Sequence, residues 1–177
     1  MAGSRARKAQ TIKGLIADAP DPELKEKLML FGQFIGDWKI DAQYIRSDGS
    51  RLEGKGEVHF GWVLDGRAIQ DVWIKHEEGP PSDVSAGTTI RFYDPKIDAW
   101  QCVWIAPPGG TVRTFLARQI GNEIVLEGTT SEGRPERWIY SEITPRSFHW
   151  RAVESYDSRK TWKLTEEMSV QRTSQSA

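Results

Sequence analysis

Strict alternation of apolar and polar residues dominates the chain after residue 36 and limits the folds open to it. Residues 38–44 place Trp38, Ile40 and Tyr44 on one phase, with charged or polar side chains on the other. This period of two is typical of a strand with one buried face. Further segments with strand character are residues 58–64, 68–76, 88–94, 99–106, 111–119, 123–129, 136–143, 147–154 and 160–171.

The connections between these segments determine how the strands pair. They are short and rich in turn residues, as at Asp65-Gly66 and Gly121-Asn122. No helical segment of crossover length lies between strands, which excludes parallel βαβ units. A long antiparallel meander must hide its edges by closing into a barrel or folding into a sandwich. We therefore predict an all-β fold, a single up-and-down antiparallel β-barrel of about ten strands.

A helix is predicted before the first strand. Asp21 is followed by Pro22 and Glu23, a combination that favours the start of a helix. Leu28 and Phe31 follow on one face, and the next residue is a glycine that can end the helix. We expect this short helix to cap one end of the barrel. The alternative is a helix that docks a partner, and a homodimer formed through the helix or through an open barrel side is a related hypothesis.

The size and charge of the chain exclude several classes of function. Its 177 residues favour one domain, which we place at residues 20–172, between flexible tails at 1–19 and 173–177. The 24 basic and 25 acidic residues give a net charge of -1, which argues against a nucleic-acid partner or an anionic membrane. The chain contains no signal-like segment and no apolar run of membrane-spanning length. Cys102 is the lone cysteine and suits a reducing compartment, so we expect a cytoplasmic protein.

Aromatic residues on the inward phases indicate a binding role. All eight tryptophans lie in predicted strands, and Phe92 in residues 88–94 is expected on the same inward phase. A barrel of about ten strands is wide enough to hold an internal cavity. Large amphipathic rings suit a flat or hydrophobic ligand, although the same rings could simply fill the barrel. The predicted function is binding of a small hydrophobic or aromatic molecule, with these candidate ligand-binding residues: Trp38, Tyr44, Phe60, Trp62, Trp73, Trp100, Trp104, Trp138, Trp150 and Trp162.

Acidic residues on the aromatic phases suggest an alternative, a barrel enzyme of the cyclase or isomerase kind. Glu142, Glu154 and Glu166 each continue an apolar phase of the last three strands. Two carboxylates facing one cavity could act as acid and base, or could pair with Arg118 or reach salt bridges at the rim. Asp71 lies on the third strand, whose inward face is ambiguous. The candidate catalytic residues are Glu154, Glu166 and Asp71.

The histidines do not form a metal-binding pattern. His59, His76 and His149 lack the spacing of a shared metal site, so we predict neither a metal nor a resident cofactor. Haem is the exception that remains open, since it needs only one proximal histidine, and His149 is the candidate.

Several scattered motifs carry a resemblance to a known family. They are FIGDW at residues 34–38, FGWVLDGRAIQDVW at 60–73, a Tyr93-Asp94-Pro95 turn and SYDSRKTW at 155–162. Together they resemble a bacterial family of calycin-like barrel proteins of uncharacterised function, related to the lipocalins and nitrobindins. The resemblance implies a ligand inside the barrel, and the nitrobindin relationship implies haem. Gly36 and Trp38 match the nitrobindin opening Gly-x-Trp-x-Gly-x-Gly, but residues 40 and 42 are not glycine, which argues against haem.

Overall fold

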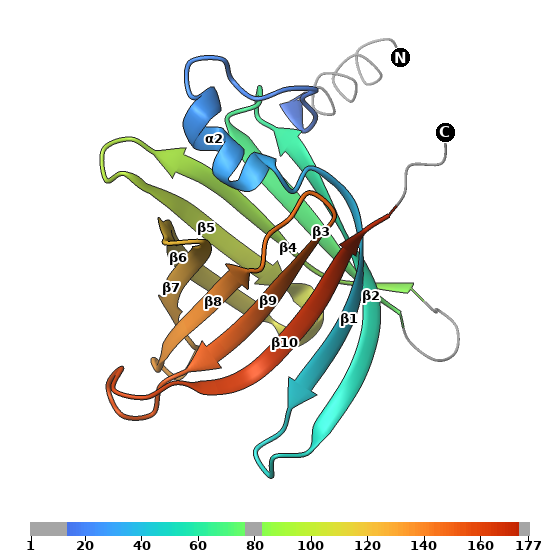
Figure 1. Ribbon diagram of the computed structural model, residues 1–177, viewed down its shortest axis with the longest axis vertical. Helices are drawn as coiled ribbons and strands as arrows, with labels where there is room; N and C mark the ends of the chain where they lie inside the picture. Colours follow the sequence, from blue (N-terminus) through green and yellow to red (C-terminus); the bar gives the residue numbers. More distant parts are fainter. Residues whose placement is uncertain (1–13, 77–82, 174–177) are drawn as a thin grey trace, which may run out of the picture.

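The computed structural model describes residues 14–76 and 83–173, which form a closed β-barrel (Figure 1). Within these residues, ten antiparallel strands follow one another around the barrel in chain order, and β1 closes it by pairing with β10. The predicted all-β, up-and-down barrel is confirmed. The strands are β1 (Gly36–Ile45), β2 (Arg51–Val63), β3 (Ala68–His76), β4 (Asp83–Asp94), β5 (Ala99–Ala106), β6 (Thr111–Ile120), β7 (Glu123–Thr129), β8 (Pro135–Ser141), β9 (Ser147–Glu154) and β10 (Lys163–Arg172).

The closure is visible in the register of β1. Ile40 lies opposite Gly56 on β2 and opposite Val170 on β10, so this strand has a hydrogen-bonded neighbour on each side. Closing a sheet in this way removes the exposed edges that would otherwise recruit other strands. Side chains at alternate positions therefore point into the barrel or away from it.

The helix α2 (Lys25–Gly32) lies across one end of the barrel, as the sequence predicts (Figure 1). Leu28 and Phe31 on its inner face are fully buried. A Cβ atom on Gly32 would lie 2.7 Å from the Trp62 ring, so a glycine is needed where the helix meets the barrel. In the described part of the chain, no helix is long and apolar enough to cross a membrane.

The start of the helix differs from the prediction. Residues 21–24 form turns, and the helix begins at Lys25. The Asp21 side chain accepts hydrogen bonds from the Glu23 amide at 2.9 Å and from Arg67 Nε at 2.6 Å, so it ties the turn to the β2–β3 connection. Upstream, Ala17 donates its amide to the Trp62 carbonyl at 2.9 Å, which connects this part of the expected tail to β2. Residues 1–13 and 174–177 of the expected tails lie outside the described residues.

An irregularity in β10 changes which residues face inward. The register shifts between Leu164 and Glu166, so that Leu164 lies opposite Val153 whereas Glu166 lies opposite Ala152. Such a bulge adds one residue and reverses the phase of the strand. Trp162 and Leu164 accordingly pack on an outer cluster, and Glu166 points inward, which corrects the prediction that all three share one phase. The outer cluster consists of Val125, Ile139 and Val153.

Candidate functional site

A cavity of about 120 Å³ lies inside the barrel, beyond the part that the helix fills. For comparison, an engineered apolar cavity of about 150 Å³ in another protein holds benzene. The cavity is therefore slightly smaller than one that is known to hold a single small ring. Its lining comes from eight strands: Ile40, Val58, Phe60, Asp71, Trp73, Thr89, Trp104, Trp138, Tyr140, Phe148, Trp150, Glu166, Met168 and Val170.

Tryptophans from four different strands form a continuous wall of this cavity. The ring centroids are 6.0 Å apart for Trp73 and Trp104, 5.8 Å for Trp104 and Trp138, and 5.4 Å for Trp138 and Trp150. These distances are typical of interacting aromatic pairs. The wall consists of rings that contact one another, so an apolar ligand would meet a preformed aromatic surface. With Phe60, these are five of the ten predicted ligand-binding residues.

Three other predicted residues lie at the helix end of the barrel, where they fill space. Trp38 is fully buried and donates its Nε1 to the Phe34 carbonyl at 2.7 Å. Trp100 packs edge-on against Phe31, with centroids 4.9 Å apart. Trp62 is buried against the helix. These rings have protein neighbours on their faces and do not line the cavity.

Tyr44 and Trp162 lie elsewhere. Tyr44 is half-buried on the inner face of β1, directly opposite Glu166, and burial together with the charge of that residue raises the pKa of its hydroxyl. Trp162 lies outside the barrel, where the Arg137 guanidinium sits 4.2 Å from its ring centroid. Whether any of the ten residues binds a ligand stays a prediction.

A buried ion pair lies at one side of the cavity. Asp71 points inward from β3 and forms a salt bridge with Arg91 of β4, and its Oδ1 also accepts the Thr89 amide at 3.1 Å. Arg91 Nη1 lies 3.4 Å from the Tyr140 hydroxyl and donates to it. Burial raises the pKa of Asp71, while the guanidinium of Arg91 opposes that shift. These contacts join β3 to β4, and a catalytic role for Asp71 stays a prediction.

Arg91 also corrects the expected orientation of β4. Its hydrophobic neighbour Phe92, expected on the inward phase with the other aromatic rings, is 43% exposed, whereas Arg91 is fully buried. Alternation alone could not indicate which phase points inward, because the strand carries apolar residues on both. The charge of Asp71 on the neighbouring strand decides the orientation by compensating the buried guanidinium.

Glu166 has a different environment from Asp71. Its side chain comes from β10, and its Oε1 atom is buried with no hydrogen-bond partner among the described residues. Burial raises the pKa of this carboxyl to about 8, and the nearby carboxylate of Glu136 adds to the shift. Glu166 is thus mainly protonated at neutral pH, and it can accept or release a proton at the cavity.

Glu136 and Arg113 form a pair that the sequence did not single out. Glu136 accepts a hydrogen bond from Trp138 Nε1 at 2.9 Å, and Arg113 Nε lies 3.2 Å from its other oxygen. Burial raises the pKa of Glu136, and these two partners oppose the shift. The sequence did contain a signal that Glu136 points inward. Glu136 shares the phase of Trp138 and Tyr140, at the opposite end of their strand from Glu142.

The remaining acidic candidates do not reach the cavity. Glu154 accepts a hydrogen bond from Arg134 Nε at 3.0 Å and another from the Tyr156 hydroxyl at 3.1 Å. Glu142 follows β8 and is exposed, as is Arg118 on β6. Of the three catalytic candidates, the structure brings Asp71 and Glu166 to one cavity and leaves Glu154 in a salt bridge.

The histidines lie away from the cavity and do not fit a haem ligand. His149 points to the outer face of β9, where its Nε2 is 3.6 Å from Glu167 Oε2. His59 pairs with Asp37, with 2.6 Å between Nδ1 and Oδ1. No histidine belongs to the cavity lining, and the described residues contain no cluster of three or more side chains that could hold a metal ion. The cavity therefore offers no axial ligand from histidine.

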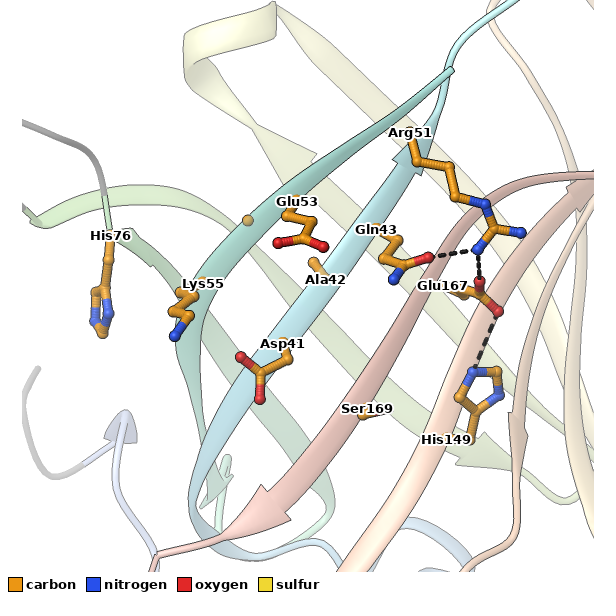
Figure 2. A pocket seen from close by; sticks show the side chains of 11 residues that line it. Asp41, Ala42, Gln43, Arg51, Glu53, Lys55, His76, His149, Glu167 and Ser169 are labelled. Atoms are coloured by element: carbon orange, nitrogen blue, oxygen red, sulfur yellow. Dashed lines mark hydrogen bonds and ion pairs between the residues drawn. The ribbon is translucent and has the colours of Figure 1, made fainter. Parts of the chain in front are cut away.

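A larger hollow of about 920 Å³ lies on the outer face of the barrel, over β1, β2, β9 and β10 and the end of β3 (Figure 2). Its lining is polar, and several of its side chains pair with each other. Arg51 Nη1 bridges Gln43 and Glu167, and Glu167 also faces His149 (Figure 2). Because the lining is polar and Arg51, Glu167 and His149 already have partners, the outer hollow is the weaker candidate for a ligand site.

Comparison with known proteins identifies a fold and no sequence family. No protein-family model matches the chain, and no curated protein matches its sequence. The S-type phycobiliprotein lyase CPES from Guillardia theta has a similar structure, with a TM-score of 0.58, 13% identity, and coverage of 84% of this chain and 93% of that one. Rv2717c from M. tuberculosis is similar with a TM-score of 0.56, 10% identity, and coverage of 87% and 99%. The chain accordingly has the calycin-like barrel fold that its motifs suggested.

Proposed function

We propose that this protein binds a small, mainly apolar aromatic molecule inside its barrel. One observation carries the proposal. The aromatic cavity contains two buried polar atoms, Glu166 Oε1 and Trp73 Nε1, with no hydrogen-bond partner within the described part of the chain. An unbonded buried polar group costs about 1–3 kcal/mol, and such groups are rare in native proteins. A ligand with a donor and an acceptor would supply both missing hydrogen bonds.

The size and shape of the cavity narrow the ligand further. About 120 Å³ is less than the roughly 300 Å³ at which typical drug-sized pockets begin. A single ring with a short substituent therefore matches the space better than a fused polycyclic molecule or a fatty acid. Stacking on the tryptophan wall would hold a flat ring by dispersion and by quadrupole complementarity.

The fold and the motifs support the same proposal at a coarser level. A calycin-like barrel encloses an interior, and the motifs of this chain resemble those of a bacterial calycin-like family, to which we assign it as part of the proposal.

Cys102 is buried and its thiol pKa is raised by burial to about 12. A protein whose one thiol is inert in this way is compatible with the cytoplasmic location we propose.

Calorimetric titration with phenol, a single neutral ring whose hydroxyl can donate and accept a hydrogen bond, tests the proposal. We expect one phenol to bind per chain. The variant Val58→Phe adds a ring to the cavity lining and should weaken binding at least tenfold, since the ligand would lose its space. The control Val72→Phe makes the same change on the outward phase of β3 and should leave the affinity unchanged. Equal affinities in the two variants, or no binding to the wild type, would reject binding in this cavity.

Glu166 favours a second candidate, an enzyme of the cyclase or isomerase kind. A buried carboxyl whose pKa is raised to about 8 is suited to general acid–base work near neutral pH. The test is a titration of carbon-13-labelled glutamate side chains by NMR, with Glu166→Gln used to assign the resonance. A midpoint near 8 supports this candidate, and a midpoint below 6 removes it, because the group would then be permanently ionised at neutral pH.

A further inference from the structure

One acidic group at the cavity has no basic partner among the described residues, and this indicates which ligand the cavity selects. We infer that the cavity selects an organic cation: a protonated amine on a small apolar or aromatic body, whose N–H group donates to Glu166 Oε1. The inference rests on the proposed function and adds the charge of the ligand. It is carried by the pairing of the buried charges and by the tryptophan wall, over which the described structure places no lysine or arginine.

Near the cavity, the two bases that the described structure places beside acidic groups are both paired. Arg91 forms a salt bridge with Asp71, and Arg113 lies against Glu136. An anionic ligand would thus find no unpaired base in the lining, and its own charge would be buried at high cost.

Glu166 is the acidic group of the cavity lining that has no basic partner among the described residues. Among the described residues it takes part in no ion pair and Oε1 accepts no hydrogen bond. The neighbouring elements face it with Tyr44 from β1, with the uncharged Ala152 from β9, and with Glu136, whose charge opposes ionisation, from β8. A protonated amine would therefore supply the one positive partner that Glu166 lacks.

The tryptophan wall leads to the same conclusion. The face of an indole ring carries negative potential and attracts cations within about 6 Å of its centroid. Two tryptophans outside the cavity have such a cation from the chain itself: Arg172 lies 4.0 Å from the Trp38 ring, and Arg137 lies 4.2 Å from Trp162. In the described structure, none of the four cavity tryptophans has a lysine or arginine over its ring. Four electron-rich rings beside an unpaired carboxyl form a site that complements a cation.

Proton release should accompany binding of such a ligand. In the empty cavity the raised pKa, about 8, keeps Glu166 mainly protonated near neutral pH. A bound ammonium favours the carboxylate, so the Glu166 proton leaves to solvent and a charge-assisted hydrogen bond forms. The affinity for an amine that remains protonated should then rise with pH up to about 8, as linkage requires.

Three probes with one ring and different charges test the inference: benzylamine, benzyl alcohol and benzoate, titrated calorimetrically at pH 7.5. We expect benzylamine to bind about tenfold more tightly than benzyl alcohol, which is the usual scale of a charge-assisted hydrogen bond, and benzoate to bind most weakly. Glu166→Gln should weaken benzylamine binding about tenfold and change benzyl alcohol binding less than twofold. Glu167→Gln is the matched control, because it makes the same change at the next residue, on the outer face.

A pH series provides a second test that needs no variant, in case Glu166→Gln does not fold. Wild-type affinity for benzylamine should increase about tenfold between pH 6 and pH 7, whereas affinity for benzyl alcohol should not increase.

The outcomes separate this inference from the proposed function. If benzyl alcohol binds as tightly as benzylamine, or benzoate binds most tightly, the cation preference is overturned and binding in the cavity survives. If none of the three probes binds at millimolar concentration and phenol does not bind either, both proposals are overturned.

Discussion

The two ends of the barrel interior use the same residue type for different purposes. At the helix end, Trp38 and Trp100 are at most 2% exposed, and they pack against Phe31, Phe34 and other rings. Toward the other end, tryptophans of four strands surround a cavity instead. The difference comes from α2, which supplies a plug of apolar side chains to one end and does not reach the other. A tryptophan on an inward phase therefore either fills the interior or lines a cavity. Which of the two it does depends on whether a segment distant in the sequence packs against it.

The buried carboxyl groups differ in the same way. Asp71 has a guanidinium and a backbone amide as partners, whereas Glu166 Oε1 has none among the residues described. A buried carboxylate with a positive partner stabilises the fold. A buried carboxylate without a partner destabilises the fold unless a ligand or a proton neutralises its charge. This contrast leads to three predictions.

The largest effect is expected from removing the salt bridge between Asp71 and Arg91. Asp71→Asn should lower the free energy of unfolding by about 3–5 kcal/mol, because it leaves the buried guanidinium of Arg91 without its counter-charge. At pH 7, Glu166→Gln should instead raise the free energy of unfolding by about 1–3 kcal/mol, because the wild-type carboxyl is neutral in the folded protein but gains free energy by ionising when the chain unfolds, and glutamine cannot ionise. Urea denaturation measures both.

A double variant is the control for the first prediction. Replacing both members by apolar residues, Asp71→Leu with Arg91→Met, should recover part of the stability lost in Asp71→Leu alone, because no isolated charge remains. If Asp71→Asn cost no more than Glu166→Gln, the contrast between the two carboxyl groups would be wrong.

The next effect is the pH dependence of stability. The pKa of Glu166 is raised to about 8 in the folded protein, so the folded state holds a proton that the unfolded chain has already released. The stabilising contribution is present below the ordinary pKa of a glutamate and is lost as pH rises toward 8, by at most about 1.4 kcal/mol per pH unit. Between pH 5.5 and 7.5, the wild type should lose about 2 kcal/mol relative to Glu166→Gln. Parallel stability curves for the two proteins would refute the raised pKa.

The smallest effect distinguishes Trp162, which lies outside the barrel, from the tryptophans of the cavity wall. Trp162→Leu removes the contact with Arg137 and should lower the free energy of unfolding by about 1 kcal/mol, with less than a twofold change in phenol affinity. Trp138→Leu removes a ring of the wall and should weaken phenol binding by more than twofold. A tenfold loss of affinity in Trp162→Leu would show that the binding surface lies elsewhere.

Much of the architecture was predictable because it depends on local patterns. Alternation and turn residues indicated the strands, and the lack of crossover helices indicated an antiparallel meander, which the structure confirms as a closed barrel. The prediction went wrong where a local pattern has two solutions. On β4 both phases carry apolar residues, and the buried salt bridge selected Arg91 over Phe92. On β10 a bulge after Leu164 reversed the phase, which no periodicity argument could detect.

The sequence by itself determined the strands, the closed barrel and a short helix before it, because hydrophobic periodicity and turn chemistry act over a few neighbouring residues. Only the tertiary structure decided where the cavity lies and which acidic group stays unpaired. Asp71 and Arg91 are 20 residues apart in the chain, and the whole of β9 lies between Glu136 on β8 and Glu166 on β10. Pairing of buried charges is a property of side chains brought together by closure of the barrel, and it is this pairing that leaves Glu166 available for a ligand.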